Sequence, residues 1–212
     1  MARTGRPRTF DIDEAIDAAL GLFWSQGYEA TSLAQLREAT GLSSASFYAA
    51  FSSKYGIFEQ VVDRYVRDYG KVMAGFIDDS RSPREALEST LRASLAMQTD
   101  PSHTSGCLVA LCGTLDPPGE EFPRGVVASR RAVDRERIIA CVRRGVENGE
   151  LAPETDAVST ASALHAFLLG LSTQIRDGVS VDALEGSIDQ ILAVWDSHAL
   201  NTSAGGRNEG SS

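Results

Sequence analysis

Cysteine and long apolar runs are both scarce in this chain of 212 residues, and each scarcity excludes a class of protein. The three cysteines, Cys107, Cys112 and Cys141, have neither the density of a disulfide framework nor the CxxC spacing of a zinc site. No apolar run is long enough to span a bilayer, and residues 1–10 lead into acidic side chains rather than into the apolar core of a secretory signal. We therefore expect a cytoplasmic protein with reduced thiols, no metal, no cofactor and no membrane partner.

Positive charge is unevenly distributed along the chain, whose formal net charge is -9. Residues 1–9 hold Arg3, Arg6 and Arg8 and no acid, whereas acids outnumber bases from residue 71 onward. The sequence thus predicts a flexible basic arm at 1–9 on an acidic body, and this distribution favours a localised contact with nucleic acid. A solubilising tail is the alternative interpretation of the arm.

Strand-like alternation of apolar and polar residues is absent over any useful length, and apolar residues recur instead at helical spacing. We therefore predict an all-α fold of about nine helices. Paired prolines exclude helix at 116–119, and the Gly-, Ser- and Asn-rich segment 201–212 is predicted to be disordered. The predicted helices cover residues 10–27, 32–40, 44–51, 54–79, 84–98, 107–115, 126–148, 155–177 and 181–200.

The ends of the first three helices are marked by local signals. Asp11 is placed to cap the first helix, and Gly27 supplies a residue that tolerates a left-handed conformation at its end. Ser32 and Gln35 have the spacing of a capping box, and Ser43 precedes the third helix. Two short helices joined by a glycine-containing turn match a helix-turn-helix unit, although this spacing also suits an ordinary helical hairpin.

Residues 10–58 resemble the DNA-binding domain of the TetR family of bacterial transcriptional regulators. The resemblance implies a helix-turn-helix DNA-binding domain at 10–54 and a helical ligand-binding and dimerisation domain at 55–200. It also implies a homodimer that binds a palindromic DNA operator, most simply a repressor that a small-molecule effector releases. The family's order and spacing are reproduced by Gly27-Tyr28, Thr31-Ser32-Leu33, Thr40-Gly41-Leu42-Ser43, Ser46-Phe47-Tyr48, Phe51 and Ser53-Lys54.

The third helix is the one expected to face the DNA major groove, and its short side chains allow close approach to base edges. Tyr48 is expected to reach a phosphate, with an aromatic plug between helices as the alternative, and Lys54 to act on a phosphate together with a helix N-terminus. Ala49 and Ala50 replace the bulkier residues of many relatives, so direct base readout is expected to be thin. The residues expected to contact DNA are Arg6, Arg8, Thr31, Ser32, Ser43, Ser44, Ala45, Ser46, Tyr48 and Lys54.

The second half of the chain is expected to enclose an effector and to form the dimer, although any one of these residues also suits the core. Small residues, Ala161 among them, allow two helices to approach closely, and the last helix has more apolar residues than its own core needs. The expected pocket residues are Met97, His103, Cys107, Leu111, Phe122, His165 and Phe167. The expected dimer residues are Ala163, Phe167, Gly170, Leu184, Ile188, Ile191 and Trp195.

Two alternatives to a ligand-released repressor depend on the cysteines. One is a thiol-sensing regulator of the same family in which Cys107 or Cys112 is the switch, but no neighbouring cation in the sequence predicts a lowered thiol pKa. The other is a cysteine-dependent enzyme that uses one of these thiols with His103 or His165. The sequence supplies no ordered nucleophile, base and orienting group for such chemistry, so no catalytic residue is predicted.

Overall fold

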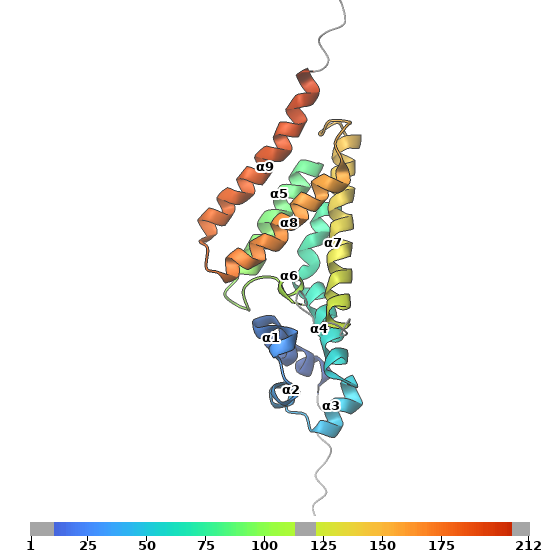
Figure 1. Ribbon diagram of the computed structural model, residues 1–212, viewed down its shortest axis with the longest axis vertical. Helices are drawn as coiled ribbons and strands as arrows, with labels where there is room; N and C mark the ends of the chain where they lie inside the picture. Colours follow the sequence, from blue (N-terminus) through green and yellow to red (C-terminus); the bar gives the residue numbers. More distant parts are fainter. Residues whose placement is uncertain (1–10, 113–121, 205–212) are drawn as a thin grey trace, which may run out of the picture.

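The structure is a computed structural model that describes residues 11–112 and 122–204. This part of the chain is all-α, as predicted, with nine α-helices, one 3₁₀ helix and no strand. Figure 1 shows an elongated molecule with α1, α2 and α3 at one end and α5, α7, α8 and α9 at the other. The elements are α1 (Ile12–Ala30), α2 (Leu33–Thr40), α3 (Ser44–Phe51), α4 (Lys54–Asp68), η1 (Gly70–Ile77), α5 (Pro83–Thr99), α6 (Leu108–Leu111), α7 (Phe122–Glu147), α8 (Ala157–Arg176) and α9 (Val181–Ala204).

We call α1, α2 and α3 the head, and the predicted local signals form there. The Asp11 carboxylate accepts a hydrogen bond from the Asp13 backbone amide at 2.8 Å. Ser32 and Gln35 make the reciprocal bonds of a capping box. Ser43 caps α3 by accepting from the backbone amide of Ser46 at 3.1 Å. Each cap satisfies a backbone N–H that the first turn of its helix leaves unpaired.

The predicted helix 54–79 is wrong in its second half, because α4 ends at Asp68 and η1 follows. Two glycines, Gly70 and Gly75, lower the helical propensity of this segment. Gly75 also lies so close to α5 that a β-carbon there would be 2.4 Å from the Thr90 hydroxyl oxygen. Tight packing against α5 therefore fixes this change of helix type, and the local apolar pattern does not reveal it.

The packing of the molecule forms two apolar cores, and their boundary does not fall at residue 54. The first core contains Phe23, Phe47 and Phe58 and continues through α4 and α6 to Val127 of α7. The second core is formed by η1, α5, α7, α8 and α9, and Ile188 of α9 is fully buried in it. Helices α4 and α6 therefore pack into the same core as the head, although both lie almost entirely in the domain that the sequence predicts to begin at residue 55.

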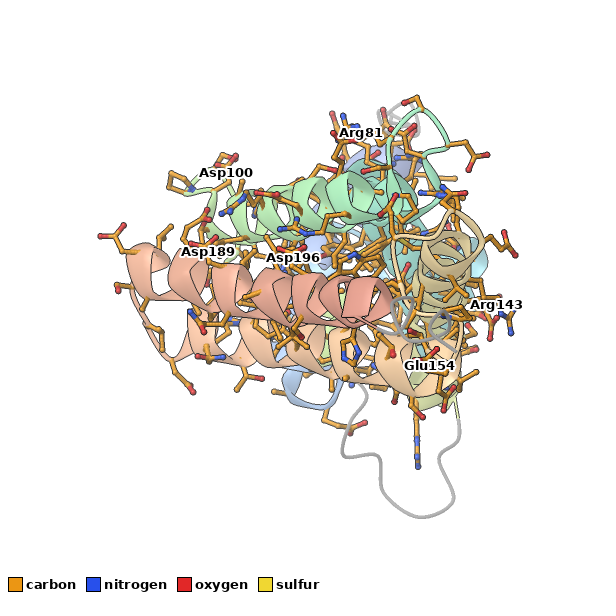
Figure 2. All side chains as sticks on the ribbon, turned by 90° about the horizontal axis from the view of Figure 1, so that it is seen from above. Arg81, Asp100, Arg143, Glu154, Asp189 and Asp196 are labelled. Atoms are coloured by element: carbon orange, nitrogen blue, oxygen red, sulfur yellow. The ribbon has the colours of Figure 1, made fainter. Side chains whose placement is uncertain are left out.

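Ion pairs fix α9 to α5 on the outer side of the second core. Arg84 lies 2.7 Å from Asp196, Arg92 lies 2.7 Å from Asp189, and Arg92 also pairs with Glu185. Figure 2 shows Asp189 and Asp196 along α9, beside α5. Since these pairs are largely exposed, each contributes at most about 1 kcal/mol, and their effect is mainly to set the register of the two helices.

The end of the chain differs from the prediction at one point. Helix α9 continues to Ala204, so the predicted disorder of 201–212 is wrong for its first four residues. The rest of that segment, like the arm at 1–9 and the loop 116–119, lies outside the described residues. No helix in the described ranges combines the length and the hydropathy that crossing a membrane requires.

Candidate functional site

The exposed surface of the head is formed by α3, at the far end of the molecule from α9 (Figure 1). Ser44, Ala45 and Tyr48 are exposed on this helix, whereas Phe47 is fully buried beneath it. Tyr48 is 47% exposed and touches the Phe47 ring edge-on, so the alternative of an aromatic plug between helices is wrong. The side chains that are free to meet a ligand on α3 are thus small, with one phenol hydroxyl.

Lys54 begins α4, directly after the capping residue Ser53. Its ammonium lies 4.1 Å from the centre of the Tyr28 ring, a cation–π contact that holds the charge beside the N-terminus of α4. The turn between α3 and α4 requires Gly56, because a β-carbon there would be 2.0 Å from the Phe51 carbonyl oxygen. Gly56 therefore allows the close turn that sets the angle between α3 and α4. Its position near the start of a helix does not predict this role.

The structure gives several predicted DNA-contacting residues other roles. Thr31 is fully buried and its hydroxyl donates to the Gly27 carbonyl at 2.6 Å, so its predicted role in direct DNA contact is wrong. Ser32 is exposed but caps α2, and the Ser43 and Ser46 hydroxyls lie 2.9 Å apart in a mutual hydrogen bond. In these four residues, hydroxyl groups that were expected to contact DNA instead make hydrogen bonds within the chain. Arg6 and Arg8 lie outside the described residues.

A cavity of about 80 Å³ lies between α4, η1, α5, α6, α7 and α8. Three of the predicted pocket residues, Met97, Cys107 and His165, line it. The prediction is wrong for three others. His103 stacks on Trp24, Leu111 packs against Gly106, and Phe167 packs against the second core. The side chain of Phe122, the seventh, is not among those described.

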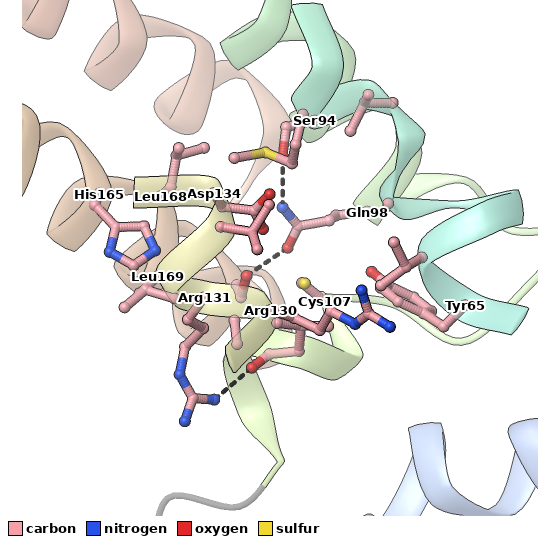
Figure 3. Close-up of a pocket in the computed structure, with 18 of the residues that line it drawn as sticks. Tyr65, Ser94, Gln98, Cys107, Arg130, Arg131, Asp134, His165, Leu168 and Leu169 are labelled. Carbon is pink, nitrogen blue, oxygen red and sulfur yellow. Dashed lines mark hydrogen bonds between the residues drawn. The ribbon is translucent and has the colours of Figure 1, made fainter. Parts of the chain in front are cut away.

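Besides Cys107 and His165, the polar wall of the cavity consists of residues that the sequence did not single out (Figure 3). The buried Gln98 amide donates to the Ser94 hydroxyl at 3.0 Å and accepts from the Ser172 hydroxyl at 2.6 Å. Asp134 and Arg137 form an ion pair at 3.0 Å in the same wall. The signal that could have found Gln98 is its spacing: it lies four positions after Ser94 and eight after Thr90, so three polar residues share the inward face of α5.

Burial sets the protonation of the titratable groups in this cavity. It raises the pKa of Asp134 to about 6, against the lowering effect of Arg137, and it lowers the pKa of His165, with Arg135 and Arg131 acting in the same direction. Burial also raises the pKa of the Cys107 thiol. At neutral pH the thiol and the imidazole are therefore uncharged.

The cavity is joined to the head at a junction that we define as Trp24, Tyr65, Tyr69, His103 and Gly106. The Trp24 indole donates to the Gly106 carbonyl at 3.0 Å, next to the cavity residue Cys107 in sequence. The rings of Tyr65 in α4 and of Tyr69, the residue that follows α4, stand edge-on to Trp24 with centroid distances of 4.9 and 4.8 Å.

The last turn of α8 reinforces this junction. A guanidinium nitrogen of Arg176 donates to the backbone carbonyl of Trp24 at 2.7 Å. Helix α1 is therefore held by the loop before α6, by α4 and by α8 at once.

The predicted dimer residues separate into buried and accessible ones. Leu184, Ile188 and Trp195 are at most 3% exposed within one protomer, so their predicted role as interface surface is wrong; they cover the second core. Their helical spacing does indicate a buried face, but that face packs against the core of the same protomer and not against a second copy. Four others keep accessible surface: Ala163, Phe167, Gly170 and Ile191.

A buried three-helix head that exposes a short capped helix beside a cationic helix start defines a helix-turn-helix DNA-binding transcriptional regulator. Residues 15–61 match the model for bacterial regulatory proteins of the tetR family. The chain is 34% identical to the HTH-type transcriptional repressor ComR of Escherichia coli K12 over 90% of its length and 91% of that protein. It is 31% identical to the repressor BdcR of the same organism, covering 85% of this chain and 86% of BdcR.

A solved structure agrees with these relatives. A cysteine mutant of the TetR family regulator CifR, complexed with 26-bp double-strand operator DNA, superimposes with a TM-score of 0.83 at 35% identity, covering 90% of this chain and all of that one. The chain belongs to the TetR family. Since its relatives are regulators, the chain is a transcriptional regulator and not an enzyme, and the cysteine-enzyme alternative is wrong.

Proposed function

We propose that the chain is a homodimeric repressor of the bacterial cytoplasm that binds a palindromic operator and is released from it by a small molecule in the cavity. The observation that carries this proposal is the composition of the cavity wall. It includes Tyr65 and Val66 of α4, the helix that follows α3, and Cys107, whose neighbour Gly106 holds Trp24 of α1. An occupant of the cavity thus touches elements that set the position of the head.

DNA binding is assigned to α3, the start of α4 and the arm. Ser44 and Ala45 offer close approach to base edges, whereas the Tyr48 hydroxyl and the Lys54 ammonium suit phosphate oxygens. Arg37 and Lys54 are the only basic residues of segment 11–56, so the head itself brings little positive charge to a polyanion. We therefore assign much of the electrostatic part of binding to the arm, through release of counterions from DNA.

The dimer is assigned to the outer faces of α8 and α9. Val158 and Val194, on these helices, are 54% and 55% exposed. A groove lined by Ala163, Ile191 and Val194 runs between the two helices and offers a surface for the same helices of a second copy. Because a twofold axis pairs the same patch with itself, such a dimer presents two α3 helices to a palindromic site.

Effector binding and operator binding are coupled if each favours a different arrangement of α4 and the junction. The coupling is then a difference in effector affinity between the free and the DNA-bound protein, and it acts equally in both directions. The thiol-sensing alternative has less support, because burial raises the pKa of Cys107 and raises those of Cys112 and Cys141 to about 11. A redox switch depends on a thiolate that such thiols rarely form at neutral pH.

Capture of genomic DNA tests the proposal. Sheared DNA from the source organism is incubated with the purified protein, and bound fragments are sequenced. We expect fragments that share one palindrome, and a Val194→Asp variant, monomeric by light scattering, that captures it far more weakly. The matched control is Ile77→Asp, which places the same charge at an apolar residue of η1 that is 47% exposed and does not line the cavity. Fragments without a common site, or a Val194→Asp variant that stays dimeric, would contradict the corresponding assignment.

A further inference from the structure

Among the described residues, the cavity wall contains a fully buried hydroxyl that is not satisfied within the chain. Tyr65 is 1% exposed, and its hydroxyl makes no hydrogen bond of good geometry with the described residues; the Cys107 thiol and the Leu108 backbone amide are the polar groups that act on it. In Figure 3 this hydroxyl is directed inward, toward the sulfur of Cys107, and a thiol is only a weak hydrogen-bonding group. A buried hydroxyl without a partner costs free energy. Such a hydroxyl in a cavity wall therefore indicates where a bound molecule can supply the missing hydrogen bond.

The charged groups of the wall, in contrast, are already paired within the chain. Arg137 pairs with Asp134, and Arg130 pairs with Asp63 of α4. Arg131 donates to the backbone carbonyls of Val109 and Cys112, at 2.6 and 3.2 Å. An additional anion would meet Asp134, and an additional cation would meet three guanidinium groups. In a poorly solvated cavity either charge would need to break an existing pair.

The remainder of the wall is mainly apolar, with Met73, Met97, Val109 and Leu168 among the lining residues. The volume of about 80 Å³ is several times the 10–15 Å³ or so that a single water needs, so it suits a compact molecule rather than a large one. A phenol hydroxyl is a better donor than acceptor, because its ring withdraws density from the oxygen lone pairs. The unpaired atom therefore calls for an acceptor on the occupant.

We propose that the effector of this cavity is a small, uncharged, mostly apolar molecule that carries an oxygen acceptor, and that the Tyr65 hydroxyl donates a hydrogen bond to that oxygen. The proposal rests on the proposed function in one respect, that the cavity is the effector site. It adds the chemical class and the residue that recognises it. In this proposal the hydrogen bond is made from α4, the helix that connects the cavity to the head.

Four probes of one ring size test the class in the dimeric full-length protein: cyclohexanone, cyclohexane, cyclohexanecarboxylate and cyclohexylammonium. Methionine labelled with ¹³C in its methyl group gives three signals, and two of them, from Met73 and Met97, report on the cavity. We expect cyclohexanone to shift both signals and to bind about tenfold more tightly than cyclohexane at pH 7.5, as one hydrogen bond implies. Both charged probes should bind more weakly than cyclohexanone.

The Tyr65→Phe variant tests the residue, because it keeps the ring contacts with Trp24 and removes only the hydroxyl. It should lose the tenfold preference for cyclohexanone, keep its affinity for cyclohexane within twofold, and unfold at the same or a higher temperature. Tyr69→Phe is the matched control, since Tyr69 stacks on Tyr65 at 5.6 Å but does not line the cavity. This control should behave as the wild type.

Three results would overturn this inference: tighter binding of a charged probe, a Tyr65→Phe variant that keeps the full preference, or no shift of the two signals with any probe. The outcomes for the proposed function are separate, because the probes are titrated without DNA. If cyclohexanone binds as expected but leaves operator affinity unchanged, the inference about the cavity stands and effector release fails. If a charged compound in this cavity releases the operator, effector release stands and the inference fails.

Discussion

The head and the remainder of the chain differ in how their structure is encoded. In the head, each helix begins at a side-chain cap that lies within a few residues of the backbone group it satisfies, as at Ser32 and Ser43. In the remainder of the chain, the body, Ser82 and Asp156 also cap α5 and α8, but the way the helices pack depends on contacts between distant segments, such as the Gly75–Thr90 approach and the Arg92–Asp189 ion pair. The difference teaches that the helices of the head are encoded largely by neighbouring residues, whereas a cavity forms only when distant helices pack together.

The two regions also differ in how they are charged and packed. The described part of the head has few basic residues, so we assign much of its electrostatic attraction for DNA to the arginines of the arm. The cavity, in contrast, buries titratable groups within the protein. The two regions meet at the junction around Trp24, and the predictions that follow test how far they act separately.

The largest expected effect is on the core of the head. Phe47→Ala removes a fully buried ring, so it should lower the free energy of unfolding by about 3–5 kcal/mol and abolish operator binding. Tyr48→Ala, one residue along the same helix, removes a largely exposed ring and should cost well under about 1 kcal/mol. Urea denaturation of both variants measures the difference. Equal losses would mean that α3 does not depend on its buried face.

The next effect concerns the cavity and depends on pH. Asp134 keeps its proton in the folded chain up to about pH 6, above the ordinary value for an aspartate. The folded state then binds more protons than the unfolded state between about pH 4 and 6, so this group's contribution lowers stability as the pH rises through that window. Asp134→Asn removes this contribution. Its stability relative to the wild type should therefore increase by about 2 kcal/mol from pH 4 to pH 7.

Glu136→Gln provides the control, because Glu136 is an exposed acid on the same helix. Urea titrations at four pH values give the required free energies for all three proteins. A stability difference between Asp134→Asn and the wild type that does not change with pH would contradict the assignment of a raised pKa to Asp134.

The arm should have a smaller, purely electrostatic effect. A protein that starts at Thr9 lacks all three arginines of residues 1–8, so the slope of log affinity against log salt should fall by up to about three. Probe binding in the cavity should not change, because the shortened protein keeps every described residue. Fluorescence anisotropy with the captured operator at two salt concentrations measures both slopes. Identical slopes would support the alternative of a solubilising tail.

Lys54 should have the smallest effect on salt dependence. Lys54→Ala should weaken binding to all DNA sequences alike and reduce the same slope by about one, because a phosphate contact positions without specifying. Ser44→Ala should instead change the preference among operator variants and leave the slope unaltered. The same anisotropy assay with a set of single-base operator variants separates the two. A sequence-dependent effect of Lys54→Ala would move that residue from phosphate contact to base readout.

These regional differences explain which predictions from sequence succeeded. The helix class, the caps of the head and the family resemblance depend on neighbouring residues, and all are confirmed. Thr31 was misassigned because its position in a motif does not reveal that its hydroxyl turns inward to the Gly27 carbonyl. Ile188 was assigned to a dimer because apolar spacing marks an inward face without saying which surface covers it.

The cavity was the hardest feature to predict. Gln98 and Tyr65 lie 33 positions apart on different helices, and they share a wall only because α4 and α5 pack beside α7. Neither residue belongs to a recognised motif. Helical periodicity identifies inward positions, but it does not identify which of them the packing leaves open.

Operator affinity with a blocked cavity tests the central claim, that the body controls the head, most directly. Ala110→Phe places a ring in the cavity wall as a fixed occupant, and Ala132→Phe places the same ring at an exposed position of α7 that does not line it. By anisotropy with the captured operator, we expect Ala110→Phe to bind at least about tenfold more weakly than the wild type, a coupling in the usual range of 1–3 kcal/mol or so. Ala132→Phe should match the wild type. A folded Ala110→Phe dimer that no longer binds cyclohexanone yet binds the operator with wild-type affinity would contradict the claim.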